Sequence, residues 1–138
     1  YKKLVIRQQK VEFLIPSIPM NRDQPLFEIV AMVKKAEDIP YVRDEIYRTV
    51  EELKTKPVDA ARLDAVKRHE KYAFLMELDS PERVAGALYL LIALTGGIEV
   101  VDRLYTAMDR VTPQDVLHAA QRYFDAKRRT VAVLKGAQ

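Results

Sequence analysis

The stretch Phe27-Glu28-Ile29-Val30-Ala31-Met32-Val33, followed shortly by Asp38-Ile39-Pro40, decides the fold class of this 138-residue chain. The side chains of the first stretch alternate between the two faces of an extended strand, and both faces are largely apolar. This pattern predicts a central strand rather than one at the edge of a sheet. Asp38 then suits a helix cap with Pro40 in the first turn, so the apolar period changes here from 2 to 3.6.

The segment before this strand also alternates, with Val11, Phe13 and Ile15 apolar at every second position. Residues 16–25 lie between the two runs, and their prolines and polar side chains favour a loop. We therefore expect strands within about 10–35. Residues 1–9 are expected to form the end of a helix.

Helical spacing of apolar residues continues from the second strand and predicts four or five helices over about 39–125. Asp59 and the run Asp79-Ser80-Pro81-Glu82 are start signals, and Gly96 suits a helix stop. Residues 84–94 are apolar almost all round, so this helix is expected to be buried between other elements. Gly86 within it suggests the close approach of another backbone. The expected inner positions of the first two helices are Val42, Ile46, Val50, Leu53, Leu63, Val66, Ala73 and Met76.

The clearest local signal is Thr112-Pro113-Gln114-Asp115, in which Thr112 caps a helix and Asp115 answers the cap from the third position. After this helix, Thr130-Val131-Ala132-Val133-Leu134 predicts a closing strand over about 129–135. Strands, then helices, then a strand indicate an α+β fold rather than a doubly wound α/β fold. The length suits a single domain over 1–138.

The composition excludes several classes of function. Net charge is only +3, and the basic residues alternate with acids along the expected helices, so nothing predicts a nucleic-acid partner. The absence of cysteine excludes disulfides and thiolate chemistry. It slightly favours a periplasmic or secreted location, although cytosolic proteins also lack cysteine. The longest apolar run, residues 84–94, is far shorter than the roughly 20 residues of a membrane span. Because the chain opens at Tyr1 without a methionine, we expect it to be cut from a longer protein.

No set of residues forms a catalytic motif, so we predict neither a catalytic residue nor a metal ligand in this chain. His69-Glu70 resembles the start of a zinc-binding HExxH helix, but the second histidine would be residue 73, which is Ala73. His118 is interpreted as a helix-face residue. The two serines, Ser17 and Ser80, lack a nearby base and are interpreted as a loop residue and a cap.

Several stretches together resemble the insulinase/pitrilysin family of zinc metallopeptidases, whose fold is that of mitochondrial processing peptidase. The resemblance covers nearly the whole chain in order and spacing, although no single piece is specific. The resembling stretches are residues 1–9, the strand entry Asp23-Gln24-Pro25-Leu26-Phe27-Glu28-Ile29, and the closing Val111-Thr112-Pro113-Gln114-Asp115-Val116, Ala120-Gln121-Arg122-Tyr123-Phe124 and Thr130-Val131-Ala132-Val133-Leu134.

The resemblance implies a partial domain: the later part of a domain with about six mostly antiparallel strands and a helical layer on one face. In such peptidases the zinc site is an HxxEH helix plus a distant Glu in another domain, so zinc is implied for the parent and no cofactor for this chain. Some partner halves supply an Arg and a Tyr that position substrate. At the matching places this chain has Val5 and either Glu12 or Phe13, so this role is not carried over and substrate-binding residues stay unknown.

These observations predict a non-catalytic scaffold or chamber-wall domain of a zinc metalloendopeptidase that cleaves peptides or proteins. Its expected partners are other domains or a partner subunit of the peptidase, and the parent's peptide substrate. One alternative is a domain of a catalytically inactive structural or assembly subunit of the same fold. Another is an unrelated α+β interaction module, which helices on both faces of a parallel sheet would favour.

Overall fold

A computed structural model describes residues 1–23 and 25–136 and begins with a short helix and a β-hairpin. The helix η1 (Lys2–Arg7) has π-helical hydrogen bonding and contacts the first strand. Strands β1 (Val11–Ser17) and β2 (Glu28–Val33) pair antiparallel, with a bulge between Val11 and Phe13. Residues 1–9 thus contain the expected helix, and both strands lie within the expected range.

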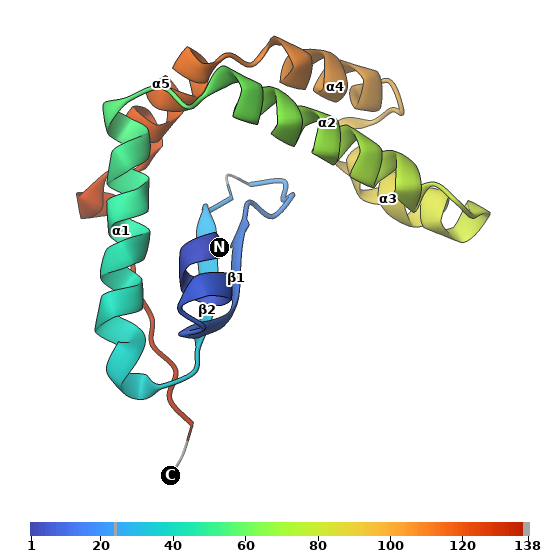
Figure 1. Ribbon diagram of the computed structural model, residues 1–138. Coiled ribbons are helices and arrows are strands. Elements are labelled where there is room, and N and C mark those ends of the chain that lie inside the picture. Colours follow the sequence, from blue (N-terminus) through green and yellow to red (C-terminus); the bar gives the residue numbers. More distant parts are fainter. Residues whose placement is uncertain (24, 137–138) are drawn as a thin grey trace.

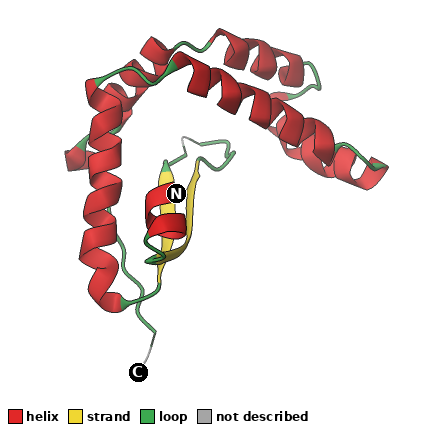
Figure 2. Ribbon diagram, in the orientation of Figure 1, coloured by secondary structure: helices red, strands yellow, loops and turns green. Residues whose placement is uncertain are grey.

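Five α-helices follow, all within the range that helical spacing predicts (Figure 2). A 3-10 turn, η2 (Ala36–Asp38), leads into α1, and another, η3 (Ala126–Arg128), follows the last helix. The helices are α1 (Ile39–Thr55), α2 (Ala60–Glu77), α3 (Pro81–Thr95), α4 (Val100–Arg110) and α5 (Pro113–Tyr123). Helix α1 stands beside the hairpin, α2, α3 and α4 form an arm that leads away from it, and α5 returns to contact α1 (Figure 1). The predicted α+β class with an antiparallel sheet is confirmed.

The deepest core is small and joins three elements. Leu4 of η1, Val11 of β1 and Val42 of α1 are 5%, 1% and 2% exposed and form one cluster. Residues of the hairpin and the next turn of α1 pack around them: Val5, Leu14, Ala31, Val33 and Ile46. Because α1 and η1 share this cluster with the hairpin, they cover one of its two faces.

The closing strand expected at 129–135 is not formed. Residues 129–136 are neither helix nor strand, and Val131, Val133 and Leu134 are exposed. A strand requires a neighbour for its backbone N–H and C=O groups. In the described residues the sheet consists of β1 and β2 alone, and this segment pairs with neither strand.

Most helix start and stop signals act as expected. The side chains of Asp59, Ser80 and Thr112 each accept a hydrogen bond from a backbone N–H in the first turn, and Gly96 ends α3 in the left-handed conformation at φ 85°. Asp38 is the exception: its side chain does not cap α1, because its carboxylate instead accepts a hydrogen bond from Lys10.

Helices α2 and α3 are much more exposed than their sequences predict. Leu91 is the only buried residue of α3, while Tyr89 is 65% exposed. In α2, Val66 and Met76 are exposed although they were expected on the inner side. Apart from the adjacent backbone of α3 itself, no described atom lies within 4 Å of a Cβ placed at Gly86, so the expected close approach of another backbone is absent. Within the described ranges no single helix is long and apolar enough to cross a membrane; only α3 and α4 together pass that test, and they meet at 89°.

We expect Val42→Ala to lower the free energy of unfolding by about 1.5–3 kcal/mol, because it removes two methyl groups from the small core and leaves a cavity. The exposed Val66, at 50% exposure, provides the matched control. Val66→Ala should change stability by less than about 0.5 kcal/mol. Urea unfolding followed by circular dichroism measures both. Equal effects of the two substitutions would contradict this assignment of the core.

The cap of α5 predicts a pH dependence of stability. Hydrogen bonds from the Thr112 hydroxyl and backbone N–H lower the pKa of Asp115. Stabilisation by this carboxylate is therefore complete above its unfolded pKa of about 3.9 and is lost as pH falls through the lower folded pKa. We expect the difference in urea midpoint between wild type and Asp115→Ala to be constant from about pH 5 to 8 and to shrink below about pH 4. Thr112→Ser keeps the hydroxyl and should show the same pH dependence of stability as the wild type. A difference in urea midpoint between wild type and Asp115→Ala that stays constant below about pH 4 would contradict the assignment.

Candidate functional site

A polar cluster fastens η1 and the start of β1 to α1. This Tyr41 cluster consists of Lys3, Gln8, Lys10, Asp38, Tyr41 and Glu45. The ammonium groups of Lys3 and Lys10 lie 5.9 and 5.5 Å from the centre of the Tyr41 ring. The Tyr41 hydroxyl is 2.9 Å from the amide nitrogen of Gln8.

Each lysine of the Tyr41 cluster is also paired with a carboxylate. Lys3 donates to Glu45, which raises the pKa of the lysine and lowers the pKa of Glu45. Lys10 donates to Asp38, whose carboxylate raises the pKa of Lys10. These pKa shifts favour the charged forms of Lys3, Lys10 and Glu45. The contacts of the two lysines are therefore those of ion pairs.

Uncommon backbone geometry surrounds the same cluster. The π-helical turn of η1 is followed by Gln9, which has φ 53° although it is not glycine, and then by the bulge in β1. Left-handed conformations at non-glycine residues and bulges both re-aim the chain locally. Together they turn the chain from η1 into β1, so that Leu4 and Val11 reach the same core.

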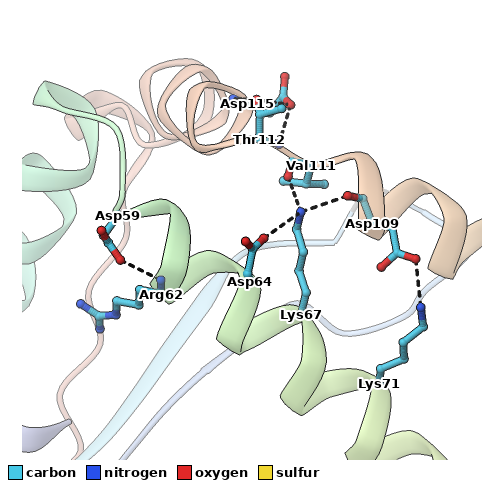
Figure 3. Close-up of polar contacts among 9 residues, drawn as sticks. All are labelled: Asp59, Arg62, Asp64, Lys67, Lys71, Asp109, Val111, Thr112 and Asp115. Carbon is cyan, nitrogen blue, oxygen red and sulfur yellow. Dashed lines mark hydrogen bonds and ion pairs between the residues drawn. The ribbon is translucent and has the colours of Figure 1, made fainter.

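A second polar arrangement joins α2 to the end of α4 (Figure 3). The Lys67 ammonium donates to the backbone oxygens of Asp109, at 3.1 Å, and Val111. It thus satisfies carbonyl groups that the end of α4 leaves without a helical partner. One turn along α2, Lys71 pairs with the Asp109 carboxylate at 2.9 Å. The cleft here, of about 340 Å³, is lined by side chains of both charges. The hydrogen bonds of Lys67 connect α2 to the end of α4 and have a structural role; we refer to them as the Lys67 tie.

A separate cleft, of about 390 Å³, lies between the hairpin loop and the end of α3. It is lined by residues 18–22 and Pro25 of the loop and by Leu94 and Thr95 of the helix. The Thr95 side chain contributes a hydroxyl group to the cleft, but this hydroxyl donates a hydrogen bond to the backbone oxygen of Leu91 at 2.6 Å. Among the described lining residues Arg22 alone has a charge, so they include no base to activate a nucleophile.

The histidines and serines singled out from the sequence lie on different elements of the structure. His69 is exposed on α2, and His118 is on α5, where its ring lies 3.1 Å from the Gln114 amide. Among residues 1–23 and 25–136, no group of three or more His, Asp or Glu side chains is arranged to hold a metal ion. Ser17 ends β1, Ser80 caps α3, and Gly96 and Gly97 follow α3.

The places that match the substrate-positioning Arg and Tyr of the resembling family hold different chemistry. Val5 packs against the core of Leu4, Val11 and Val42. Glu12 lies in the bulge of β1 and is exposed, and Phe13 is on the uncovered face of the hairpin. None of the three supplies a cation or a phenol.

Sequence reasoning did not find the Tyr41 cluster or the Lys67 tie. Lys3 and Glu45 are 42 residues apart, as are Lys67 and Asp109, and no spacing rule joins them. The one available signal was the position of Lys67 within a charged helix, which indicated only a solvated face.

No protein-family profile and no curated protein matches this chain. Among solved structures, the chain is similar to the crystal structure of a protease from Helicobacter pylori, with a TM-score of 0.79 and 21% sequence identity. The match covers 90% of this chain and 30% of that protease chain, so this chain spans less than a third of its length. At this identity the likeness shows the fold: nearly all of this chain has a fold that forms part of a protease.

We expect Lys67→Met to destabilise the chain by about 1–3 kcal/mol, because it leaves backbone carbonyls at the end of α4 without their donor. Lys71→Met removes an exposed ion pair and should cost at most about 1 kcal/mol. Urea unfolding compares the two variants. A cost for Lys71→Met equal to or above that for Lys67→Met would contradict the assignment of Lys67 as the tie.

Proposed function

We propose that this chain is a non-catalytic scaffold or chamber-wall domain of a zinc metalloendopeptidase of the insulinase/pitrilysin type. The observation that carries the proposal is the likeness to the Helicobacter pylori protease, which extends over 90% of this chain but only 30% of that protein. A segment of this kind provides walls and packing surfaces, while bond cleavage is performed by residues in another part of the parent.

The exposed surface supports a role inside a larger assembly. The chain exposes 11145 Å², whereas a compact monomer of its 15.9 kDa mass exposes roughly 7,400 Å². A standard protein interface takes only about 800 Å² from each partner. Many of the exposed large apolar side chains lie on the hairpin and on α2, α3 and α4, and they include Ile15, Val30, Met76, Tyr89 and Leu104. Other domains or a partner subunit of the peptidase would cover them.

The residues of this chain do not fit a zinc site. A tetrahedral site takes three or four His, Cys or carboxylate ligands around one ion. His69 and His118 are on different helices, the chain has no cysteine, and the described carboxylates do not gather around either ring. The proposal therefore includes no catalytic step in this chain and assumes that zinc and the hydrolytic residues belong to the remainder of the parent.

Zinc titration and peptide hydrolysis test this proposal on two samples, the parent protein and the 138-residue chain. The parent should hydrolyse an unstructured peptide, lose this activity with a chelator and regain it with Zn²⁺. The isolated chain should show neither hydrolysis nor stoichiometric zinc binding by calorimetry. The variant His69→Ala/His118→Ala, which lacks both imidazoles, measures the background of weak surface binding.

Tight one-to-one zinc binding or hydrolysis by the isolated chain would overturn the scaffold role. A parent without zinc-dependent hydrolysis, and without an intact HxxEH helix, would instead make this chain part of a structural or assembly subunit of the same fold.

A further inference from the structure

The described chain consists of two units joined by two short linkers. Residues 1–55 and 113–136 form the first unit, which contains the buried core and which we call the body. The second unit is the arm of α2, α3 and α4, residues 60–110. Among the described residues, no side-chain hydrogen bond, ion pair or ring contact joins the arm directly to the body. The orientation of the arm therefore depends on the linkers at 56–59 and 111–112.

Both linkers have the conformation of a hinge. Lys56 is extended at φ −149° and precedes Pro57, which disfavours a helical conformation at Lys56. Both residues of the linker 111–112 are extended as well. In movements of one unit against another, a few residues between packed elements absorb the changes in φ and ψ. Extended residues do this without breaking the hydrogen bonds of the adjoining helices.

Charged side chains from both units hold one peptide group, between Val111 and Thr112 (Figure 3). Its carbonyl oxygen, on Val111, accepts a hydrogen bond from the Lys67 ammonium of α2 in the arm. Its N–H, on Thr112, donates to the Asp115 carboxylate of α5 in the body, at 2.9 Å. A peptide group is planar, so its C=O and N–H cannot rotate independently. This peptide group therefore connects a cation of the arm to an anion of the body.

The cation of this arrangement is shielded from water. The Lys67 side chain is 13% exposed, whereas that of Lys71, one turn further along α2, is 45% exposed. Hydrogen bonds from a charged donor are stronger than neutral ones, and salt screens them less when the donor is partly buried. Lys71 pairs with the Asp109 carboxylate and does not contact the 111–112 peptide group, so it provides a matched control.

The arm and the body face each other across the cleft of about 390 Å³. One wall is formed by residues 18–22 and Pro25 of the hairpin loop, in the body. The other wall is formed by Leu94 and Thr95 at the end of α3, in the arm. Because each unit provides one wall, rotation about the linkers changes the width of the cleft.

We infer that the 111–112 peptide group, held by Lys67 and Asp115, is a clamp that sets the angle of the arm and thereby the opening of this cleft. With both side chains bound, the arm has the angle shown in Figure 1. Release of Lys67 frees the Val111 carbonyl, and the arm then swings as a unit about the two linkers. The inference concerns contacts within this chain and does not depend on the proposed function.

Distances between paired spin labels, measured by double electron–electron resonance, test this inference on the 138-residue chain, which has no cysteine of its own. The reporter pair Glu52→Cys/Glu82→Cys places one label on α1 and one on α3, at exposed positions. With the clamp intact, the pair should give one narrow distance distribution. Lys67→Met should make this distribution broad or two-peaked, because it populates further arm angles. Lys71→Met should leave it narrow.

A second label pair separates a swing of the arm from loosening inside the arm. Glu70→Cys/Arg103→Cys places labels at exposed positions of α2 and α4, and Lys67→Met should leave their distance distribution unchanged. Asp115→Ala releases the same peptide group from the body side and should broaden the reporter distribution. It also replaces Lys67→Met as the test if that variant fails to fold. Combining both substitutions should broaden the distribution no further than the larger single effect, because they act through one peptide group.

Four outcomes overturn the inference. The first is a reporter distribution that is already broad with the clamp intact, and the second is one that stays narrow in both Lys67→Met and Asp115→Ala. The third is equal broadening by Lys71→Met. The fourth is equal broadening of the pair within the arm, which would show that Lys67 only fastens α4 to α2.

Discussion

The contact of Leu4, Val11 and Val42 is the constraint on which the rest of the structure depends. An isolated two-stranded hairpin is marginal in water, and it becomes stable when another element covers one of its faces. Here α1 and η1 provide that cover, and the ion pairs of the Tyr41 cluster hold both in place around it.

Once α1 is fixed, α5 packs against it, and the Gln121 amide donates to the Lys54 backbone oxygen at 3.0 Å. The ring of Phe124, just after α5, also contacts the ring of Phe27, just before β2, with centroids 4.9 Å apart, so both ends of the helical layer contact the hairpin region.

The arm of α2, α3 and α4 has a different physical basis. Leu91 is its one buried residue, so packing contributes less there than local helix chemistry does. Side-chain caps at Asp59 and Ser80 satisfy backbone N–H groups at two of its helix starts, and Lys67 satisfies carbonyls at one helix end. Phe74 and Tyr105 add a ring contact between α2 and α4 with centroids 5.4 Å apart, and burial raises the pKa of the Tyr105 hydroxyl. The arm thus has defined helices but only a thin layer of contacts between them.

Local chemistry made the elements predictable from the sequence. The Thr112–Asp115 capping box, the Gly96 stop and the alternation of β2 each depend on residues close together in the chain, and each is present in the structure. Features that depend on distant residues were not predictable. Asp38 was assigned a cap, but its carboxylate pairs with Lys10, 28 residues away. Residues 129–135 have the alternation of a strand but pair with neither β1 nor β2, and local pattern cannot specify such a pairing. For the candidate site, the sequence indicated that His69 and His118 are unsuited to catalysis, while the Lys67 tie needed the fold.

The mismatches in burial all have the same direction. Val66, Tyr89 and Met76 were expected inside and are exposed, and β2, expected to be central, has one neighbour in the described residues. Errors of pattern reading alone would also place some polar residues inside, yet no polar or charged residue of the described chain is buried. A one-sided difference follows if the apolar pattern was selected in a larger structure, where faces that are open here lie against more polypeptide. Under the proposed function, the apolar residues of β2 and α3 would face other parts of a larger protein, and their exposed side chains mark the surfaces that those parts would cover.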